Sequence, residues 1–165
     1  MSPMSDQDAV PGFAIAVVRE DGRWRCAAMD AFVLGELDAA ITELRKVRST
    51  GAVFGLLGVD DQFFLLLRPS PAGLSLLLSD AAAALDYDIA ADALDLLRVE
   101  PPSEDDEEVW PEGALDILAD IGLPAAELQV IVGEVDLYPD EQLQMIAQRC
   151  GFADEFSKLL DTIPQ

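Results

Sequence analysis

Apolar residues follow two different periods along this chain, and the first of them marks strands. Residues 13–20 form a nearly continuous apolar, β-branched run, and residues 23–30 form a second strand-like segment. Asp21-Gly22 stands between them and supplies the two positive-φ positions of a tight turn. The pattern therefore predicts a β-hairpin over residues 13–30.

The second period, of three and four residues, marks a helix soon after this hairpin. The apolar positions of its expected buried face are Leu37, Ala40, Ile41, Leu44 and Val47. This spacing is typical of one face of an α-helix, which we expect to end near residues 49–51.

Three more apolar runs then alternate with turn residues. They cover residues 52–59, 62–68 and 74–78, and they are separated by Asp60-Asp61 and by a segment rich in Pro and Gly. Short apolar runs divided in this way are typical of an antiparallel meander.

A second helix is expected after the meander. Ser79 is its predicted N-cap, and Asp80 is its predicted first residue, where a carboxylate interacts with the positive end of the helix dipole. The side chains predicted to face inward are Leu85, Ile89, Ala93 and Leu96.

The resulting order, β-β-α-β-β-β-α, predicts an α+β fold with a five-stranded antiparallel sheet. In topology alone it resembles the longin and roadblock-type folds, which usually act as interaction modules, although a fold does not determine a function. We expect the sheet domain to cover residues 1–99, an acidic linker to cover residues 100–111, and a small helical region to cover residues 112–165.

The helical region contains four short helical patterns. Gly122 ends the first, and Pro124 is the predicted first residue of the second. Pro139 begins the third, which ends at Gly151. None of the four is long enough to be stable in isolation, so we expect them to pack together or on the sheet.

The balance of charged residues indicates the kind of partner. Ten basic residues against thirty-two acidic ones give a formal charge of −22. This charge repels polyanions, so we expect no direct binding to nucleic acid or to an anionic membrane, and attraction to a basic protein surface instead. No apolar segment approaches the roughly 18 residues that a membrane span needs, which favours a cytoplasmic protein.

Histidine is absent from the chain, which removes the most common general base and every His-ligated zinc site. Cys26 and Cys150 occupy apolar positions, and we interpret both as core thiols. We therefore expect no catalytic site, no metal and no cofactor. Chemistry by carboxylates with magnesium stays open as an alternative because acids are abundant.

Three charged clusters could be ligand sites, but we prefer to interpret them as ordinary surface or helix-end charges. The acidic run of residues 104–108 lacks the glycine and ligand spacing of a calcium loop, which favours a solvated linker. The acids at helical spacing are expected on an exposed helix face. The cations at the end of the first helix could hold a phosphate, but cations at this position are also expected from the helix dipole. These two groups are Asp88, Asp92 and Asp95, and Arg45, Lys46 and Arg48.

The best candidate for a partner contact is the turn ahead of the third helical pattern. Its residues are Asp136, Leu137, Tyr138, Pro139, Asp140 and Glu141. Such a turn is either an ordinary helix start with its apolar residues tucked inward, or an exposed docking loop, because aromatics flanked by charge are common anchors. Phe152 is the further anchor predicted in this half of the chain.

Three segments carry a family resemblance. They are Leu-Ser-Asp-Ala-Ala-Ala-Ala at 78–84 leading into Asp-Ile-Ala-Ala-Asp at 88–92, Asp-Ile-Leu-Ala-Asp-Ile-Gly-Leu at 116–123, and Asp-Leu-Tyr-Pro-Asp-Glu at 136–141. In this order they make the chain similar to the tRNA adenosine deaminase-associated protein family. The family is named for bacterial genes lying beside that of the deaminase, so the resemblance implies association with tRNA modification and no particular activity.

The sequence agrees that the chain is not the deaminase itself. That class of enzyme holds zinc through His and two Cys, in His-x-Glu and Pro-Cys-x-x-Cys motifs, and this chain has neither motif. The leading hypothesis is a non-catalytic accessory or regulatory protein that binds a basic partner, the tRNA adenosine deaminase. The alternatives are a carboxylate-only, magnesium-dependent phosphoryl hydrolase and a self-assembling module that forms homodimers.

Overall fold

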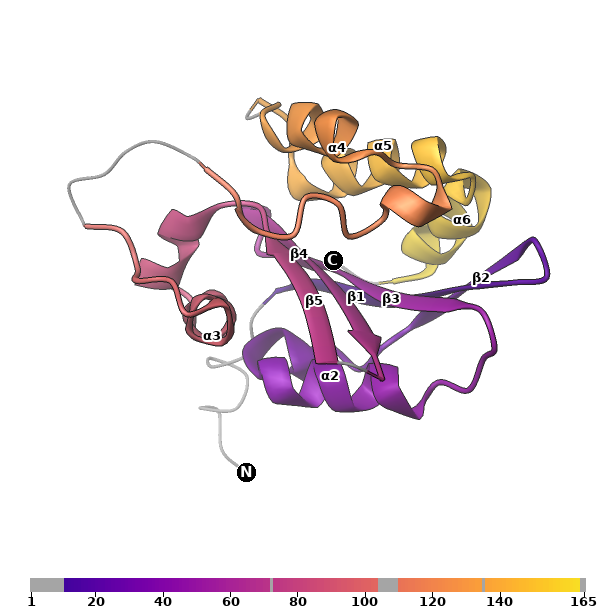
Figure 1. Cartoon of the computed structure of the whole chain (residues 1–165), viewed down its shortest axis with the longest axis horizontal. Helices are drawn as coiled ribbons and strands as arrows, with labels where there is room; N and C mark the ends of the chain where they lie inside the picture. The colour runs from indigo at the N-terminus through magenta and orange to yellow at the C-terminus, as the bar shows by residue number, and fades with distance from the viewer. Residues whose placement is uncertain (1–10, 72, 104–109, 135, 164–165) are drawn as a thin grey trace.

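An antiparallel sheet with helices on both faces organises the molecule (Figure 1). The computed structural model describes residues 11–71, 73–103, 110–134 and 136–163, so residues 104–109 of the predicted linker lie outside the described part. In the spatial order β2-β1-β3-β4-β5-β6, the strands are β1 (Gly12–Glu20), β2 (Arg23–Ala28), β3 (Ala52–Val59), β4 (Phe63–Ser70), β5 (Gly73–Leu78) and β6 (Glu112–Gly113).

The predicted α+β class and the β1–β2 hairpin are confirmed, but the described residues form a sheet of six strands and the prediction of five is wrong. The additional strand, β6, pairs with the edge of β5, with Gly113 opposite Leu77. Gly113 has φ 117°, and a Cβ at this position would overlap the backbone carbonyl of Leu76. Two residues are too short for a period in the sequence, so their pairing depends on the fold. The likeness to longin and roadblock folds stays a prediction.

Helices form one layer on each face of the sheet. The first layer comprises η1 (Ala31–Gly35), α2 (Leu37–Lys46), η2 (Ala81–Leu85) and α3 (Asp88–Leu97). The second layer comprises η3 (Ala119–Ile121), α4 (Ala125–Val132), α5 (Pro139–Cys150) and α6 (Ala153–Thr162). None of the helices in the described ranges is long and apolar enough to cross a bilayer.

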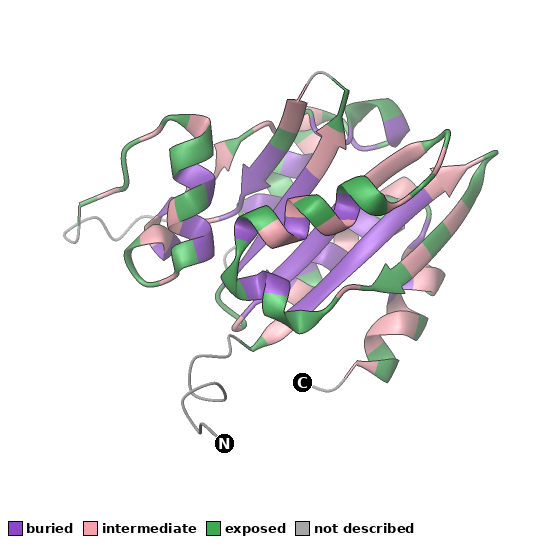
Figure 2. Ribbon diagram, turned by 90° about the horizontal axis from the view of Figure 1, so that it is seen from below, coloured by how far each residue is buried: buried purple, intermediate pink, exposed green. Residues whose placement is uncertain are grey.

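Alternation along the strands separates two cores. Ile15, Val17 and Phe54 pack under α4–α6, whereas Ala14 and Leu57 pack under α2 and α3. Strand residues alternate between the two faces of a sheet, so one set of apolar runs serves both layers. Figure 2 shows the result, with buried central strands and exposed outer faces on the helices.

The predicted second helix is instead two elements. Ser79 Oγ accepts a hydrogen bond from the backbone N–H of Phe64 at 2.9 Å, so Ser79 is no helix cap. Asp80 caps the short η2 by accepting from the backbone N–H of Ala82 at 3.0 Å, and α3 begins separately. Leu85 and Leu96, predicted to face inward, are 42% and 51% exposed. The break between η2 and α3 changes the helical phase, which explains the wrong placement of Leu85. Leu96 lies near the end of α3, the helix in which Ile89 and Ala93 are buried as predicted.

Three of the four C-terminal helical patterns are confirmed as α4, α5 and α6, whereas the first forms only the short η3 before Gly122. Gly122 and Gly151 end η3 and α5 with φ of 115° and 110°, conformations that glycine adopts without steric cost. Pro124, predicted as the first helical residue, is the N-cap residue of α4.

Two contacts fix this C-terminal layer on the sheet. Phe152 is fully buried, with its ring centroid 4.8 Å from that of Trp24 on β2 and 5.8 Å from that of Phe54 on β3. At the other side, Arg68 of β4 donates to both carboxylate oxygens of Asp120, at 2.6 Å and 2.8 Å. The division at residues 100–111 stays a prediction, but the helices that follow it share a core with the sheet.

Loss of the Phe152 ring should destabilise the whole fold. Phe152→Ala is expected to lower the free energy of unfolding by about 3–5 kcal/mol, because the cavity lies between the sheet and α5–α6. Tyr138→Ala is the matched control, since its side chain is 60% exposed, and it should change the free energy by less than about 1 kcal/mol. Urea denaturation monitored by tryptophan fluorescence measures both, and equal losses would contradict this assignment of the core.

Candidate partner-binding surface

The turn between α4 and α5 has the geometry of a stabilised helix start. Pro139 is the first residue of α5 and is buried. The backbone N–H of Tyr138 donates to Glu141 Oε1 at 3.0 Å, so this carboxylate satisfies a donor just ahead of the helix. The Tyr138 side chain is 60% exposed, and Leu137 is half-buried. The turn therefore holds an aromatic side chain outward on an ordered backbone.

A residue that the sequence did not single out, Gln142, holds this turn in place. Its buried side-chain amide donates to the backbone carbonyl of Ile131 at 3.0 Å, and more weakly to those of Val132 and Glu134 at 3.4 Å. These carbonyls belong to the end of α4 and the residues just after it, where helix acceptors lack partners within the helix. The amide therefore links the two helices on either side of the turn.

An apolar hollow lies between α5 and α6, next to Leu137 of the same turn. Its volume is about 390 Å³, and it is lined by Leu137, Asp140, Glu141, Gln144, Met145 and Leu160. Ser157 Oγ donates to Gln144 Oε1 at 2.9 Å, which ties α6 to α5 at this place. We call Tyr138 together with the six lining residues the groove surface. Three of the seven were missed from sequence: Gln144, Met145 and Leu160 come together only when the two helices pack.

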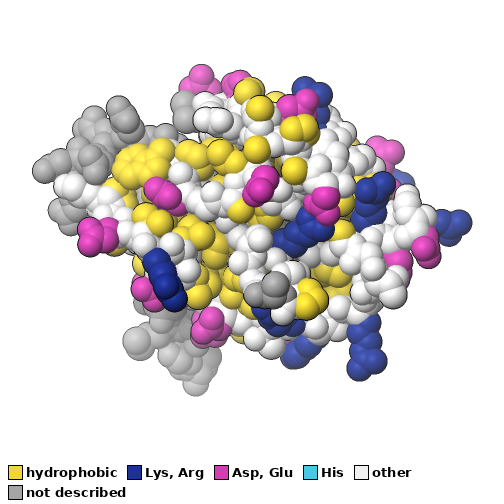
Figure 3. All heavy atoms as spheres, in the orientation of Figure 1, with side chains coloured by type: hydrophobic (Ala, Val, Ile, Leu, Met, Phe, Trp, Pro, Cys, Tyr) yellow, Lys and Arg dark blue, Asp and Glu magenta, His cyan; other side chains and the backbone are white. Residues whose placement is uncertain are grey.

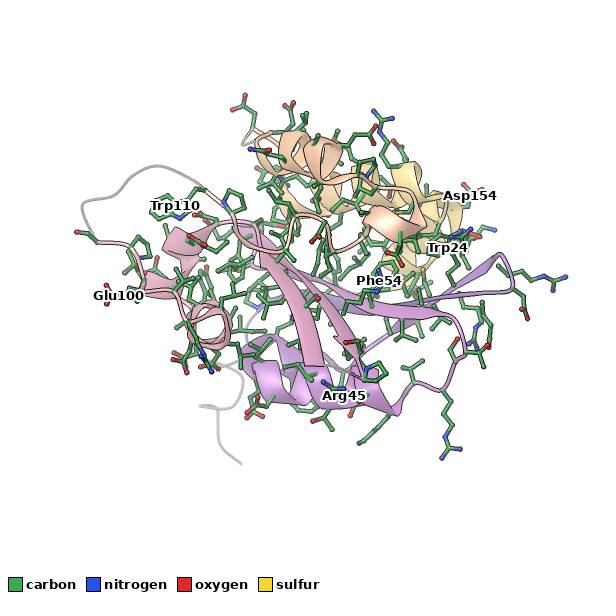
Figure 4. The ribbon with its side chains drawn as sticks, viewed as in Figure 1. Trp24, Arg45, Phe54, Glu100, Trp110 and Asp154 are labelled. Carbon is green, nitrogen blue, oxygen red and sulfur yellow. The ribbon has the colours of Figure 1, made fainter. Side chains whose placement is uncertain are left out.

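Phe152 does not belong to this surface, although the sequence suggested it as an anchor. Its side chain is fully buried against Trp24 and Phe54, which Figure 4 shows pointing into the space between the sheet and the C-terminal helices. The backbone N–H of Phe152 donates to the carbonyl of Ala147 at 2.9 Å, which folds the chain back after Gly151. A residue that follows a glycine helix ending commonly packs inward, and this signal could have been used.

The acidic residues of α3 lie on an exposed helix face, as predicted. Partial desolvation and repulsion from Asp88, Asp38 and Asp95 raise the pKa of Asp92 above its usual value. Asp38 belongs to α2, so α2 and α3 present one acidic surface on the layer opposite the groove surface. In the described ranges, no group of three or more His, Cys, Asp or Glu side chains is arranged to hold a metal ion.

Both cysteines are half-buried and have weakly acidic thiols. Burial raises the pKa of the Cys150 thiol to about 11 and that of the Cys26 thiol to about 12. The thiolate is the nucleophile, so these thiols are poorly reactive at neutral pH.

Thiol labelling tests this assignment. In a Cys26→Ser background, native Cys150 at pH 8 should react about 100-fold more slowly than in the denatured chain, because a pKa raised by about two units lowers the thiolate fraction by that factor. The rate can be followed with an aromatic disulfide reagent. Equal rates in the native and denatured chains would show that Cys150 is a reactive surface thiol.

Comparison with known proteins identifies a similar protein and a matching family. Protein Rv3753c of Mycobacterium tuberculosis (strain ATCC 25618 / H37Rv) is 58% identical over 158 residues, which cover 94% of this chain and 91% of the relative. No solved structure matches the chain significantly. Residues 12–153 match the family described as Rv3753c-like tRNA adenosine deaminase-associated protein, a range that includes the sheet, α4, α5 and the turn at Tyr138. The chain belongs to this Rv3753c-like tRNA adenosine deaminase-associated protein family.

Proposed function

We propose that this protein is a non-catalytic accessory protein that binds the tRNA adenosine deaminase through the groove surface. The observation that supports this most is the exposed side chain of Tyr138, next in sequence to Leu137, which lines an apolar hollow together with Asp140 and Glu141. Exposed aromatic side chains next to desolvated pockets are the usual energetic centres of protein interfaces, and Met145 adds an adaptable apolar contact.

Charge complementarity points to a partner of this kind. An enzyme that acts on tRNA presents Lys and Arg to the phosphates, so it carries a basic surface. A chain with a formal charge of −22 is attracted to such a surface over long range. At physiological ionic strength the attraction is screened beyond about 8 Å, so affinity needs apolar contacts as well. The groove surface combines both kinds of contact.

The side chains give little support to a catalytic role. Zinc deaminases need a His and paired Cys, and this chain has no His and two cysteines far apart in sequence. A carboxylate-only hydrolase would need acids converging in a concave site, whereas Asp88, Asp92 and Asp95 are exposed on one helix. An accessory role leaves the chemistry to the deaminase and places both proteins in the cytoplasm, where tRNA is modified.

The edge strands of the sheet favour association with a different protein over association with a second copy of this chain. β2 carries the exposed Arg23 and Arg25, and like charges at an edge strand oppose pairing with an identical strand. At the opposite side, β6 covers the edge of β5 at Leu77 and Leu78. Homodimers formed by strand pairing are therefore disfavoured.

Binding kinetics test the proposal. Tyr138→Ala should raise the dissociation rate of the complex with the deaminase of the same organism about 30-fold, as expected for the loss of a central aromatic anchor, and change the association rate little. Val130→Ala is the matched control, because Val130 on α4 is 62% exposed and lies outside the groove surface. Surface plasmon resonance measures both rates.

Two outcomes would reject this proposal. One is the absence of a complex with the deaminase at low salt. The other is an equal effect of Tyr138→Ala and Val130→Ala on the dissociation rate, which would place the contact elsewhere.

A further inference from the structure

Basic side chains gather at one end of the sheet, although the chain as a whole is acidic. Three connections lie at this end: the β1–β2 turn, the α2–β3 loop and the β4–β5 turn. The register shows this, because Arg19 pairs with Ala52, Gly55 with Leu67, and Ser70 with Gly73. We call it the hairpin end and define it by its cations. They are Arg19, Arg23, Arg25, Arg45, Lys46 and Arg48, six of the ten Lys and Arg residues of the chain.

The three chain segments that form the hairpin end carry a net positive charge. Residues 19–25, 43–51 and 69–73 contain six basic and three acidic residues, a net of +3 against −22 for the chain. The acids are partly engaged: Glu20 accepts from the Thr50 hydroxyl at 2.9 Å, and Glu43 lies 3.6 Å from Lys46. On the face drawn in Figure 3, the blue Lys and Arg side chains gather towards the side of the β1–β2 hairpin.

Most of these cations share one face of the sheet. Ala27 of β2 is opposite Ala16, which packs under α2, so Arg25 and Arg23, two and four residues away, lie on the same face. The last turn of α2 ends at this face, held there by Arg45, which donates to the carbonyls of Ser70 and Gly73 at 3.3 Å and 3.2 Å. Figure 4 shows Arg45 at this end of α2. Cations from the hairpin and from α2 therefore line the same end of the sheet, while Arg19 lies on the other face, 5.5 Å from the centre of the Trp24 ring.

We propose that the hairpin end contacts the phosphodiester backbone of the tRNA that the deaminase holds. The inference rests on the proposed function, because the acidic remainder of the chain repels free RNA and the enzyme must bring the two together. Arginine matches phosphate geometry through paired N–H donors, and five of the six cations are arginine. The β1–β2 hairpin and the α4–α5 turn lie well apart in Figure 1, so the two surfaces can contact enzyme and RNA together.

The alternative explanation of Arg45, Lys46 and Arg48 was a helix-end effect of the dipole. It does not account for Arg19, Arg23 and Arg25, which belong to strands. The expectation that this chain avoids nucleic acid came from the total charge, and it holds for the free chain. The structure adds that the charge is unevenly distributed.

Two triple variants with the same loss of charge test the inference. Arg23→Ser, Arg25→Ser and Arg48→Ser remove three exposed cations of the hairpin end. Arg98→Asn, Arg149→Ser and Lys158→Ser remove three cations located elsewhere, and Asn suits the left-handed backbone at Arg98, where φ is 60°. The assay measures the affinity of the preformed complex with the deaminase for its substrate tRNA, across a salt series.

The hairpin-end variant should bind tRNA about tenfold more weakly at low salt, and its slope of log affinity against log salt should be shallower by about 2–3, as for the loss of three phosphate contacts. The control variant should match the wild-type complex within about twofold. Equal losses in the two variants, or a loss in neither, would overturn the inference while leaving the proposed function intact.

Assembly of each complex without tRNA is measured in parallel. Assembly weakened by the hairpin-end variant alone would show that these cations contact an acidic protein surface, which also overturns the inference. If the wild-type chain forms no complex, the proposed function fails, and the tRNA contact fails with it.

Discussion

The packing of Phe152 against Trp24 and Phe54 is the contact on which the rest of the structure depends. It joins the α5–α6 turn to β2 and β3 through three aromatic rings within one core. Trp24 belongs to the strand that carries Arg23 and Arg25, while α5 and α6 carry the groove surface. One hydrophobic cluster therefore fixes the relative positions of the two surfaces to which we assign binding.

Covered faces restrict where such a protein can bind anything. Helices occupy both sides of the sheet, so binding falls to turns, strand ends and outer helix faces. These available surfaces differ in charge, because the cations lie at the hairpin end and the acids lie on the outer faces of α2 and α3. Partial desolvation and the repulsion from neighbouring acids raise the pKa of Asp92, so its ionised carboxylate opposes folding at neutral pH. The acidic surface of α2 and α3 adds to the long-range attraction between the chain and a basic partner, while the contact itself is assigned to the groove surface.

The elements that the sequence predicted correctly are those whose ends carry residues suited to a positive φ. Asp21-Gly22 identified the first hairpin, and Gly151 identified the end of α5, because all three residues adopt a positive φ. β6 could not be predicted, since two residues carry no period and their pairing depends on β5. The turn at Tyr138 was predicted from its composition. Gln142 and Leu160 were missed, because their roles arise only when α4, α5 and α6 pack together.

Hydrogen exchange of the chain with and without the deaminase tests the central claim most directly. The claim is that the C-terminal helical layer, and not the acidic face of α2 and α3, meets the enzyme. The account predicts slower exchange on binding in peptides that cover residues 136–145 and 156–161, with residues 37–46 and 88–97 unchanged. Protection confined to α2 and α3, with the turn at Tyr138 unaffected, would contradict it.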